Sequence, residues 1–197
     1  MRIFLAGATG VLGKRILPLL VQDGHTVAGM TRSPSKAGEL RSLGAVPVIC
    51  DVFDSEALTA AISAFAPNAV MHQLTDLPDH RDQLSEFGPR NDRIRTEGTR
   101  NLLAAARTAG AEHVIVQSIA WRPPGRGEAV DELERQVLAV GGVVVRYGQL
   151  YGPGTFYPDG PPPPPRIQVD AAARATPPLI TAPSGIVVVA EDPAEVS

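Results

Sequence analysis

The sequence predicts an α/β fold, a doubly wound parallel sheet of the Rossmann type with about seven strands. Short β-branched runs alternate with longer segments of helical periodicity along most of the chain. A glycine-rich turn joins the first of these runs to the first helical segment. The chain has 197 residues, of which 44% are hydrophobic, and this is enough for a single domain with a sizeable core.

The predicted strands are the short apolar runs of the sequence. They cover residues 2–6, 26–30, 46–49, 69–72, 113–117, 143–146 and 186–190. The predicted helices cover residues 11–22, 35–43, 54 or 55 to 65, 91 or 92 to 109, 128–140 and 169–180. Residues 74–90 are polar and contain two prolines, so they predict a long loop. Residues 151–166 are rich in Gly and Pro and predict irregular structure.

Composition and charge exclude several classes of protein. The net charge of -3 argues against a nucleic-acid or anionic-membrane partner, because such proteins usually carry a basic excess. The single Cys50 excludes an intramolecular disulfide and every multi-cysteine metal site, and no metal site is predicted. No apolar run approaches the roughly 20 residues of a membrane span, and the glycine turn comes too early for a signal peptide. These observations predict a cytoplasmic protein.

The first turn of the chain carries the clearest binding motif, Gly7-Ala8-Thr9-Gly10-Val11-Leu12-Gly13. In this pattern Gly7 makes the tight turn, Gly10 lets a pyrophosphate approach the backbone, and Gly13 lets helix and sheet pack closely. The helix that follows offers free N–H groups and its positive dipole end to that anion. The motif therefore predicts nucleotide binding, and the alternative is a turn that is only structural.

The end of the second strand indicates which dinucleotide binds. NAD-specific folds usually place an acidic residue there for the ribose 2′-hydroxyl. Here the chain has Arg32, with Lys36 nearby, and a guanidinium can pair with a 2′-phosphate. We therefore expect NADP(H) rather than NAD(H), and the alternative is a solvated surface arginine. After the third strand, Asp51 and Val52 are expected beside the adenine, although Asp51 can equally cap the next helix.

Several stretches of the sequence resemble the short-chain dehydrogenase/reductase superfamily, in its extended or atypical epimerase/dehydratase branch. The matching stretches are residues 7–13, 24–27, 97–103, 114–118, 146–154 and 166–170. This resemblance implies that residues 1–150 form the NAD(P)-binding domain. Residues 151–197 are then a reduced substrate lobe packed on the same domain, including a closing strand. It also implies a small-molecule substrate and allows a homodimer.

The same resemblance implies roles for individual residues. Ser118 occupies the position that hydrogen-bonds the substrate oxygen. Leu74 and Thr75 are expected to border the ribose of the cofactor. Tyr147 and Gln149 are expected near the nicotinamide, with Gln149 in place of the usual Asn.

The main departure from this family concerns proton transfer. Its members normally carry Tyr-x-x-x-Lys on the helix after Ser118, where the Tyr is the general acid/base and the Lys lowers its pKa. The corresponding positions here hold Arg126 and Val130, and the only lysines of the chain are Lys14 and Lys36. The catalytic Tyr and Lys are therefore missing.

Two hypotheses follow from this departure. In the first, the protein is an NADP(H)-dependent oxidoreductase or epimerase, acting on a small carbonyl, hydroxyl or sugar-like substrate. Tyr151 is then the preferred substitute acid/base, and Tyr147, Tyr157 and His72 are the other candidates. In the second, the protein binds a dinucleotide without redox turnover, as a sensor, a scaffold or a non-redox catalyst.

Overall fold

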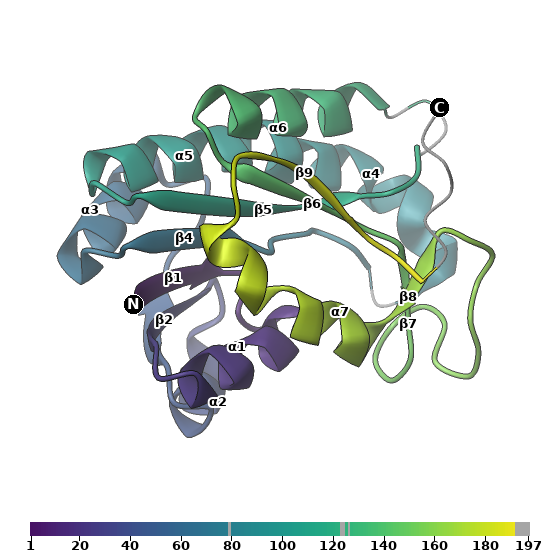
Figure 1. Ribbon diagram of the computed structural model, residues 1–197, viewed down its shortest axis with the longest axis horizontal. Helices are drawn as coiled ribbons and strands as arrows, with labels where there is room; N and C mark the ends of the chain where they lie inside the picture. Colours follow the sequence, from purple (N-terminus) through teal and green to yellow (C-terminus); the bar gives the residue numbers. More distant parts are fainter. Residues whose placement is uncertain (79, 123–124, 126, 192–197) are drawn as a thin grey trace.

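A computed structural model describes residues 1–78, 80–122, 125 and 127–191. Its main sheet has seven parallel strands in the order β3-β2-β1-β4-β5-β6-β9 (Figure 1). The strands are β1 (Arg2–Ala6), β2 (Thr26–Thr31), β3 (Val46–Ile49), β4 (Ala69–His72), β5 (His113–Ile119), β6 (Val143–Tyr147) and β9 (Gly185–Val189). This confirms the doubly wound fold, with the strand order reversing between β1 and β4.

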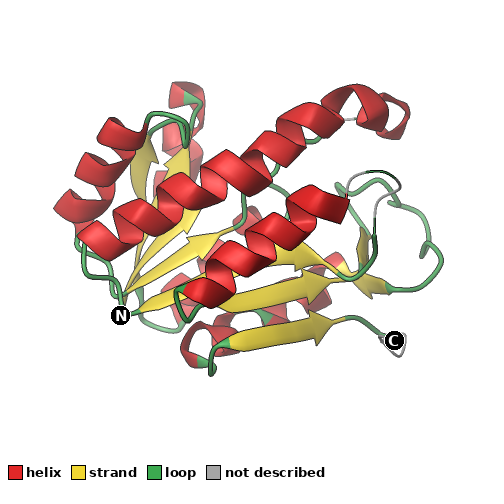
Figure 2. Cartoon of the chain, turned by 90° about the horizontal axis from the view of Figure 1, so that it is seen from above, coloured by secondary structure: helices red, strands yellow, loops and turns green. Residues whose placement is uncertain are grey.

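Helices cover both faces of the sheet (Figures 1 and 2). The main helices are α1 (Gly13–Gln22), α2 (Ala37–Ser42), α3 (Ser55–Phe65), α5 (Thr99–Thr108), α6 (Gly127–Ala139) and α7 (Val169–Ala175). Helices α1 and α7 pack on one face, whereas α3, α5 and α6 pack on the other. The alternation of strand and helix along the chain produces this three-layer arrangement.

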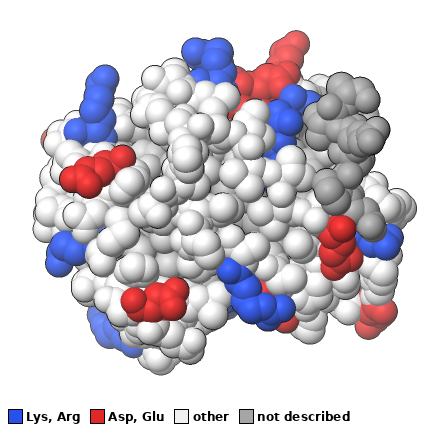
Figure 3. Space-filling view, viewed as in Figure 1, with Lys and Arg blue, Asp and Glu red and all other residues white. Residues whose placement is uncertain are grey.

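The face over α1, α7 and β9 is mainly uncharged (Figure 3). Acidic and basic side chains are interspersed around its margin. Across the described residues, none of the helices combines the length and apolar character that crossing a membrane requires.

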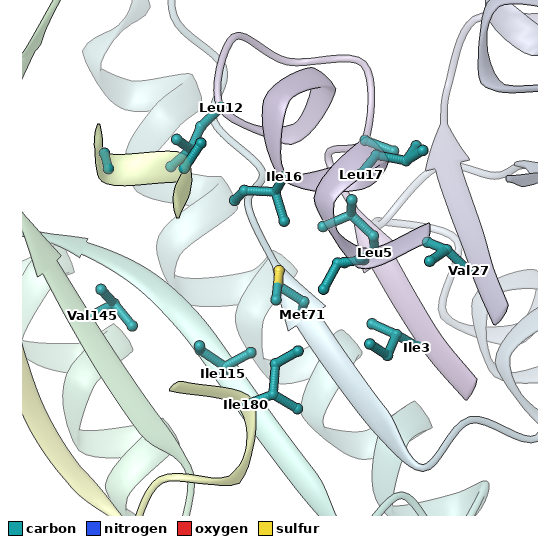
Figure 4. Packing of buried hydrophobic residues seen from close by; sticks show 14 of the residues in the cluster. Ile3, Leu5, Leu12, Ile16, Leu17, Val27, Met71, Ile115, Val145 and Ile180 are labelled. Carbon is teal, nitrogen blue, oxygen red and sulfur yellow. The ribbon is translucent and has the colours of Figure 1, made fainter. Parts of the chain in front are cut away.

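Beneath this face lies the larger part of the core (Figure 4). Ile16 and Leu17 of α1 point toward Leu5 of β1 and Met71 of β4, and all four side chains are fully buried. Complete burial of such a side chain stabilises the fold by roughly 1.5–3 kcal/mol. This packing fixes the start of α1 against the carboxyl ends of β1 and β4.

The predicted loop at residues 74–90 is the main error of the sequence-based assignment. A short 3-10 turn (Arg81–Gln83) and helix α4 (Leu84–Arg93) occupy most of this region. A π-helical segment (Ile94–Gly98) then joins α4 directly to α5. The prediction was wrong because Pro89 lies inside α4 and because only Asn91 of this helix is buried. A solvated helix has no apolar stripe from which it can be predicted.

The chain after Tyr151 returns to the main sheet. Strand β7 (Gln149–Tyr151) pairs with β8 (Arg166–Gln168), and the residues between them are irregular, as predicted. The helix predicted for residues 169–180 divides into α7 and a 3-10 turn (Pro177–Thr181). Strand β9 then pairs with β6, which is the predicted closing strand. Residues 192–197 of the predicted lobe lie outside the described residues.

Candidate functional site

The glycine turn lies at the carboxyl end of β1, where the strand order reverses. The Gly10 N–H donates to the Gly7 carbonyl at 3.0 Å, and the Lys14 N–H donates to the Gly10 carbonyl at 3.0 Å. Gly7 has a φ of 87°, a conformation that side-chain-bearing residues rarely adopt. The predicted turn is therefore present and leads directly into α1.

Close packing requires two of the three glycines. A Cβ on Gly13 would lie 2.1 Å from the Gly7 carbonyl oxygen, and one on Gly7 would lie 2.5 Å from the Gln73 carbonyl oxygen. A Cβ on Gly10 would have only the Gly7 carbonyl oxygen nearby, at 3.3 Å. Gly10 therefore leaves one side of the turn open.

The start of α1 is suited to an anion. None of the described side chains caps this helix end, and its first turn has no acidic residue. The positive end of the helix dipole and the uncapped turn therefore fit a pyrophosphate. Val11 is 39% exposed beside the turn, whereas Leu12 is buried in the core, so Leu12 can offer a ligand only its backbone. The Thr9 hydroxyl lies 3.2 Å from the Thr31 hydroxyl and ties the turn to the end of β2.

A cavity of about 210 Å³ adjoins the end of β2 and is lined by Arg32, Phe53, Asp76, Arg90 and Arg93. Arg32 donates from Nη2 to Asp76 Oδ1 at 3.2 Å. Arg90 donates to the same carboxylate from Nε at 3.0 Å and from Nη2 at 3.2 Å. Of these residues the sequence predicted only Arg32. Asp76 and Arg90 lie within residues 74–90, which were predicted as a loop.

Lys36, the other predicted cation, ends a 3-10 turn at Pro34–Lys36, just after β2. Its role toward a cofactor stays a prediction.

Asp51 does not cap α3. Its Oδ1 accepts from the Phe53 N–H at 2.9 Å, whereas Asp54 caps the helix by accepting from the Ala57 N–H at 3.0 Å. The capping alternative for Asp51 was therefore wrong. Val52 is buried, and its carbonyl accepts from Asn101 Nδ2 at 3.0 Å. The expected adenine contacts of both residues stay predictions.

His72, at the end of β4, has a structural role. Its Nδ1 accepts from the Leu74 N–H at 3.1 Å, so Nε2 carries the proton and donates to the Thr99 hydroxyl at 3.2 Å. Burial lowers the pKa of His72 to about 4, so the ring is neutral at physiological pH. Both ring nitrogens have hydrogen-bond partners within the protein, so His72 is not available as a catalytic proton donor in this geometry. Leu74 is half-buried and Thr75 exposed beside it, and their expected ribose contacts stay predictions.

Ser118 is buried and belongs to a charged cluster. Its hydroxyl donates to Glu134 Oε1 on α6 at 2.6 Å. Arg146 of β6 donates to the same carboxylate with Nε at 2.9 Å and Nη2 at 2.6 Å. Burial opposes ionisation of Glu134, but the hydrogen bonds from Arg146 and Ser118 outweigh it and hold the pKa of Glu134 below its ordinary value. The Ser118 hydrogen is thus committed to Glu134, and its role toward a substrate oxygen stays a prediction.

The candidate tyrosines differ in accessibility. Tyr147 is buried and its hydroxyl donates to Thr176 Oγ1 at 2.6 Å, because Thr176 itself donates to the Ala172 carbonyl. Burial raises the pKa of Tyr147 to about 12. Tyr151 is half-buried and donates to Glu191 Oε1 at 2.6 Å, and this hydrogen bond raises the pKa of Tyr151. Neither hydroxyl is poised as a strong acid, and the catalytic role of Tyr151 stays a prediction.

Gln149 links two parts of the irregular segment. Its Nε2 donates to the Pro163 carbonyl at 2.9 Å, and its Oε1 accepts from the Tyr157 hydroxyl at 3.2 Å. Its amide and the Tyr147 hydroxyl therefore have partners within the protein. Contacts of Tyr147 and Gln149 with the nicotinamide stay predictions.

Helix α6 supplies no Tyr or Lys to this site. Val130, at the expected Lys position, is buried in the core, and Arg126, at the expected Tyr position, lies outside the described residues. Within the part of the chain that the structure describes, no group of His, Cys, Asp and Glu residues is arranged to hold a metal ion.

Comparison with known proteins shows what most of this chain is similar to. The model of a family described as NAD(P)H-binding matches residues 7–138. A 3-diazoavenalumate denitrifying reductase from a Streptomyces species is 40% identical over 182 residues, which cover 80% of this chain and 59% of the relative. The chain thus spans about three-fifths of that reductase.

Two solved structures have the same fold. A UDP-glucose 4-epimerase from Thermotoga maritima, solved with UDP-glucose, has a TM-score of 0.79 at 17% identity, covering 96% of this chain and 77% of that one. The Thermus thermophilus UDP-glucose 4-epimerase, solved with NAD, has a TM-score of 0.79 at 21% identity, covering 96% and 78%.

Proposed function

Because the chain belongs to the NAD(P)H-binding family, with the fold of the extended short-chain dehydrogenase/reductases, we propose that it is an NADPH-dependent reductase that removes nitrogen from a diazo substrate. One observation carries the proposal: the glycine turn leads into a helix α1 with no side-chain cap, whereas α6 lacks the Tyr and Lys of carbonyl reduction. A chain that keeps the first and lacks the second suits a reduction that needs no proton from a side chain.

The chemistry of a diazonium group meets this condition. Reduction of a carbonyl places negative charge on oxygen, and a general acid must protonate it. A diazonium cation that takes up a hydride becomes neutral, releases N₂ and keeps hydrogen on its carbon, so charge and atoms balance without a further proton. A reduced nicotinamide supplies the hydride when bound. The protein then has to bind and orient the two reactants.

Residues of this chain are available for that binding. The turn at residues 7–13 would hold the pyrophosphate on the backbone N–H groups at the start of α1. Arg32 would contact the 2′-phosphate of NADP(H), since its side chain is 61% exposed beside the cavity. The Streptomyces relative is named for a diazo substrate, and its 40% identity supports the same substrate class here.

Release of dinitrogen tests the proposed reaction. The protein is incubated with NADPH and a hydroxyaryl diazonium acid, and loss of reduced nicotinamide and isotope-labelled N₂ are both measured. We expect N₂ and oxidised nicotinamide in equal amounts, above a control without protein. Turnover of ketones or aldehydes without N₂ release would indicate a carbonyl reductase instead. Binding of NADPH without turnover of either substrate would favour the non-redox alternative.

Exchange of Arg32 for alanine tests the cofactor preference. We expect the wild type to bind NADPH at least about tenfold more tightly than NADH, because a charge-assisted hydrogen bond contributes roughly 1.5–3 kcal/mol. Arg32→Ala should lose most of this preference and keep its affinity for NADH, as measured by calorimetry. Arg107→Ala, an exposed substitution on α5, is the charge-matched control. Equal affinity for both cofactors, unchanged in Arg32→Ala, would contradict the assignment.

A further inference from the structure

The cavity beside Arg32 is built by three strand ends and one helix. Arg32 follows β2, Phe53 follows β3 and Asp76 follows β4, while Arg90 and Arg93 belong to α4. Its volume of about 210 Å³ is below the roughly 300 Å³ at which pockets for whole small ligands begin. The cavity can therefore take one end of a dinucleotide rather than all of it.

Asp76 is the residue of this cavity that both Arg32 and Arg90 contact. It is buried, and its backbone N–H donates to Asn91 Oδ1 at 3.0 Å. Its carboxylate accepts both hydrogen bonds of the Arg90 fork, which is the strongest geometry for such a pair. Arg32 contacts the same carboxylate through a single hydrogen bond of 3.2 Å, so its guanidinium retains donors for another anion.

Arg93 closes the opposite side. Its guanidinium carbon lies 3.8 Å from the centre of the Phe53 ring, and its Nε and Nη2 donate to Glu97 at 2.7 and 3.2 Å. The lining has three guanidinium groups and the carboxylate of Asp76, and Glu97 beside the lining pairs with Arg93. Three arginines against these two carboxylates leave one positive charge in excess, which suits a phosphate monoester, an anion near neutral pH.

The position of the cavity indicates which phosphate it would take. Thr31, directly before Arg32, lies 3.2 Å through its hydroxyl from Thr9 of the glycine turn. A dinucleotide whose pyrophosphate lies on that turn can extend its adenosine toward the ends of β2 and β3, because the strand order places β2 beside β1 and β3 beside β2.

We propose that Arg90 and Arg93 complete, with Arg32, a clamp for the 2′-phosphate of NADP(H), in which Asp76 orients the arginines. This inference rests on the proposed binding of NADPH and adds α4 as the second side of the phosphate site. The two α4 arginines are then specificity-determining residues, since NADH has no phosphate to offer them.

Binding of nucleotide fragments to the full chain tests the clamp. Adenosine 2′-monophosphate and 5′-monophosphate differ only in the position of the phosphate, and calorimetry compares them in the wild type, Arg93→Gln and Arg90→Gln. Arg135→Gln is the matched control, because it removes an exposed arginine from an ion pair on α6. We expect each α4 variant to bind the 2′-phosphate about tenfold more weakly, with 5′-phosphate binding unchanged within about twofold. Arg135→Gln should match the wild type.

Unchanged 2′-phosphate binding in Arg93→Gln would overturn the clamp, as would an equal loss for both nucleotides. Arg93 is 55% exposed and donates its side-chain hydrogen bonds to Glu97 rather than to Asp76. Arg93→Gln therefore decides the result if circular dichroism shows that Arg90→Gln does not fold. The two proposals fail separately. If the wild type binds neither NADPH nor NADH, the proposed function is refuted. If its preference for NADPH over NADH depends on Arg32 alone, only the clamp is refuted.

Discussion

Replacing Glu134 by alanine is expected to lower the free energy of unfolding by about 3–5 kcal/mol. Glu134 is 5% exposed and accepts hydrogen bonds from Ser118 of β5 and Arg146 of β6. Its removal leaves the Arg146 guanidinium, whose side chain is only 18% exposed, without the carboxylate that compensates its charge. A buried charge that loses its partner costs far more than the intact pair contributes.

Chemical denaturation followed by circular dichroism measures this effect. Ser118→Ala removes one hydrogen bond but keeps the ion pair, so it should cost only about 1 kcal/mol. Glu132→Ala breaks an exposed ion pair with Arg135 on the same helix and should change stability by about 1 kcal/mol or less. If Glu134→Ala is no more destabilising than these controls, the cluster does not hold β5, β6 and α6 together.

The cost of Glu134→Ala should also depend on pH. The hydrogen bonds from Arg146 and Ser118 outweigh burial and hold the pKa of Glu134 below its ordinary value of 4.5. The unfolded chain therefore binds a proton at this site before the folded protein does, and stability is lost as pH falls through the lowered pKa. The stability difference between wild type and Glu134→Ala should be constant above about pH 5 and shrink in more acidic solution. A difference that grows on acidification would contradict this ionisation state.

The strands were predicted accurately because buried parallel strands carry a local signal. Residues 2–6, 46–49 and 69–72 were predicted with the bounds of β1, β3 and β4. Strands β1 and β4 are almost entirely buried, whereas β3 lies at the edge of the sheet and is partly exposed, yet all three appear in the sequence as short apolar runs. Helix α4 could not be predicted in this way, since only Asn91 of this helix is buried and its Arg90 pairs with Asp76, 14 residues earlier in the chain.

The residues of the site show the same difference between local and long-range signals. The glycine turn and Arg32 could be predicted because their positions follow from neighbours in the chain. Asp76 and Arg90 are separated by 14 residues, and Ser118 and Glu134 by 16. Which carboxylate an arginine or serine contacts depends on how strands and helices pack, and periodicity in the sequence contains no information about it.

Exchange of Gly13 for alanine is expected to destabilise the fold by about 3 kcal/mol. The new Cβ would lie 2.1 Å from the Gly7 carbonyl oxygen and 2.9 Å from Ala8 Cα, and both are backbone atoms that cannot rotate away. Helix α1 would have to move off the carboxyl end of β1, and its buried contacts with the core would be strained.

Gly10→Ala should affect dinucleotide binding more than stability. Its Cβ would approach only the Gly7 carbonyl oxygen, at 3.3 Å, so the cost in stability should stay near 1 kcal/mol or below. Its methyl group would occupy the open side of the turn and should weaken dinucleotide binding at least about tenfold, because the backbone can no longer approach the pyrophosphate.

Denaturation and calorimetry on both variants separate packing from binding. Gly38→Ala is the matched control, since a Cβ at this helical position meets no atom within 4 Å, and it should stabilise α2 by about 0.5–1 kcal/mol. If Gly13→Ala proved as stable as Gly10→Ala, the close approach of α1 to β1 would not be what fixes this turn. If Gly10→Ala bound NADPH as the wild type does, the pyrophosphate would have to lie elsewhere than on the open side of the turn.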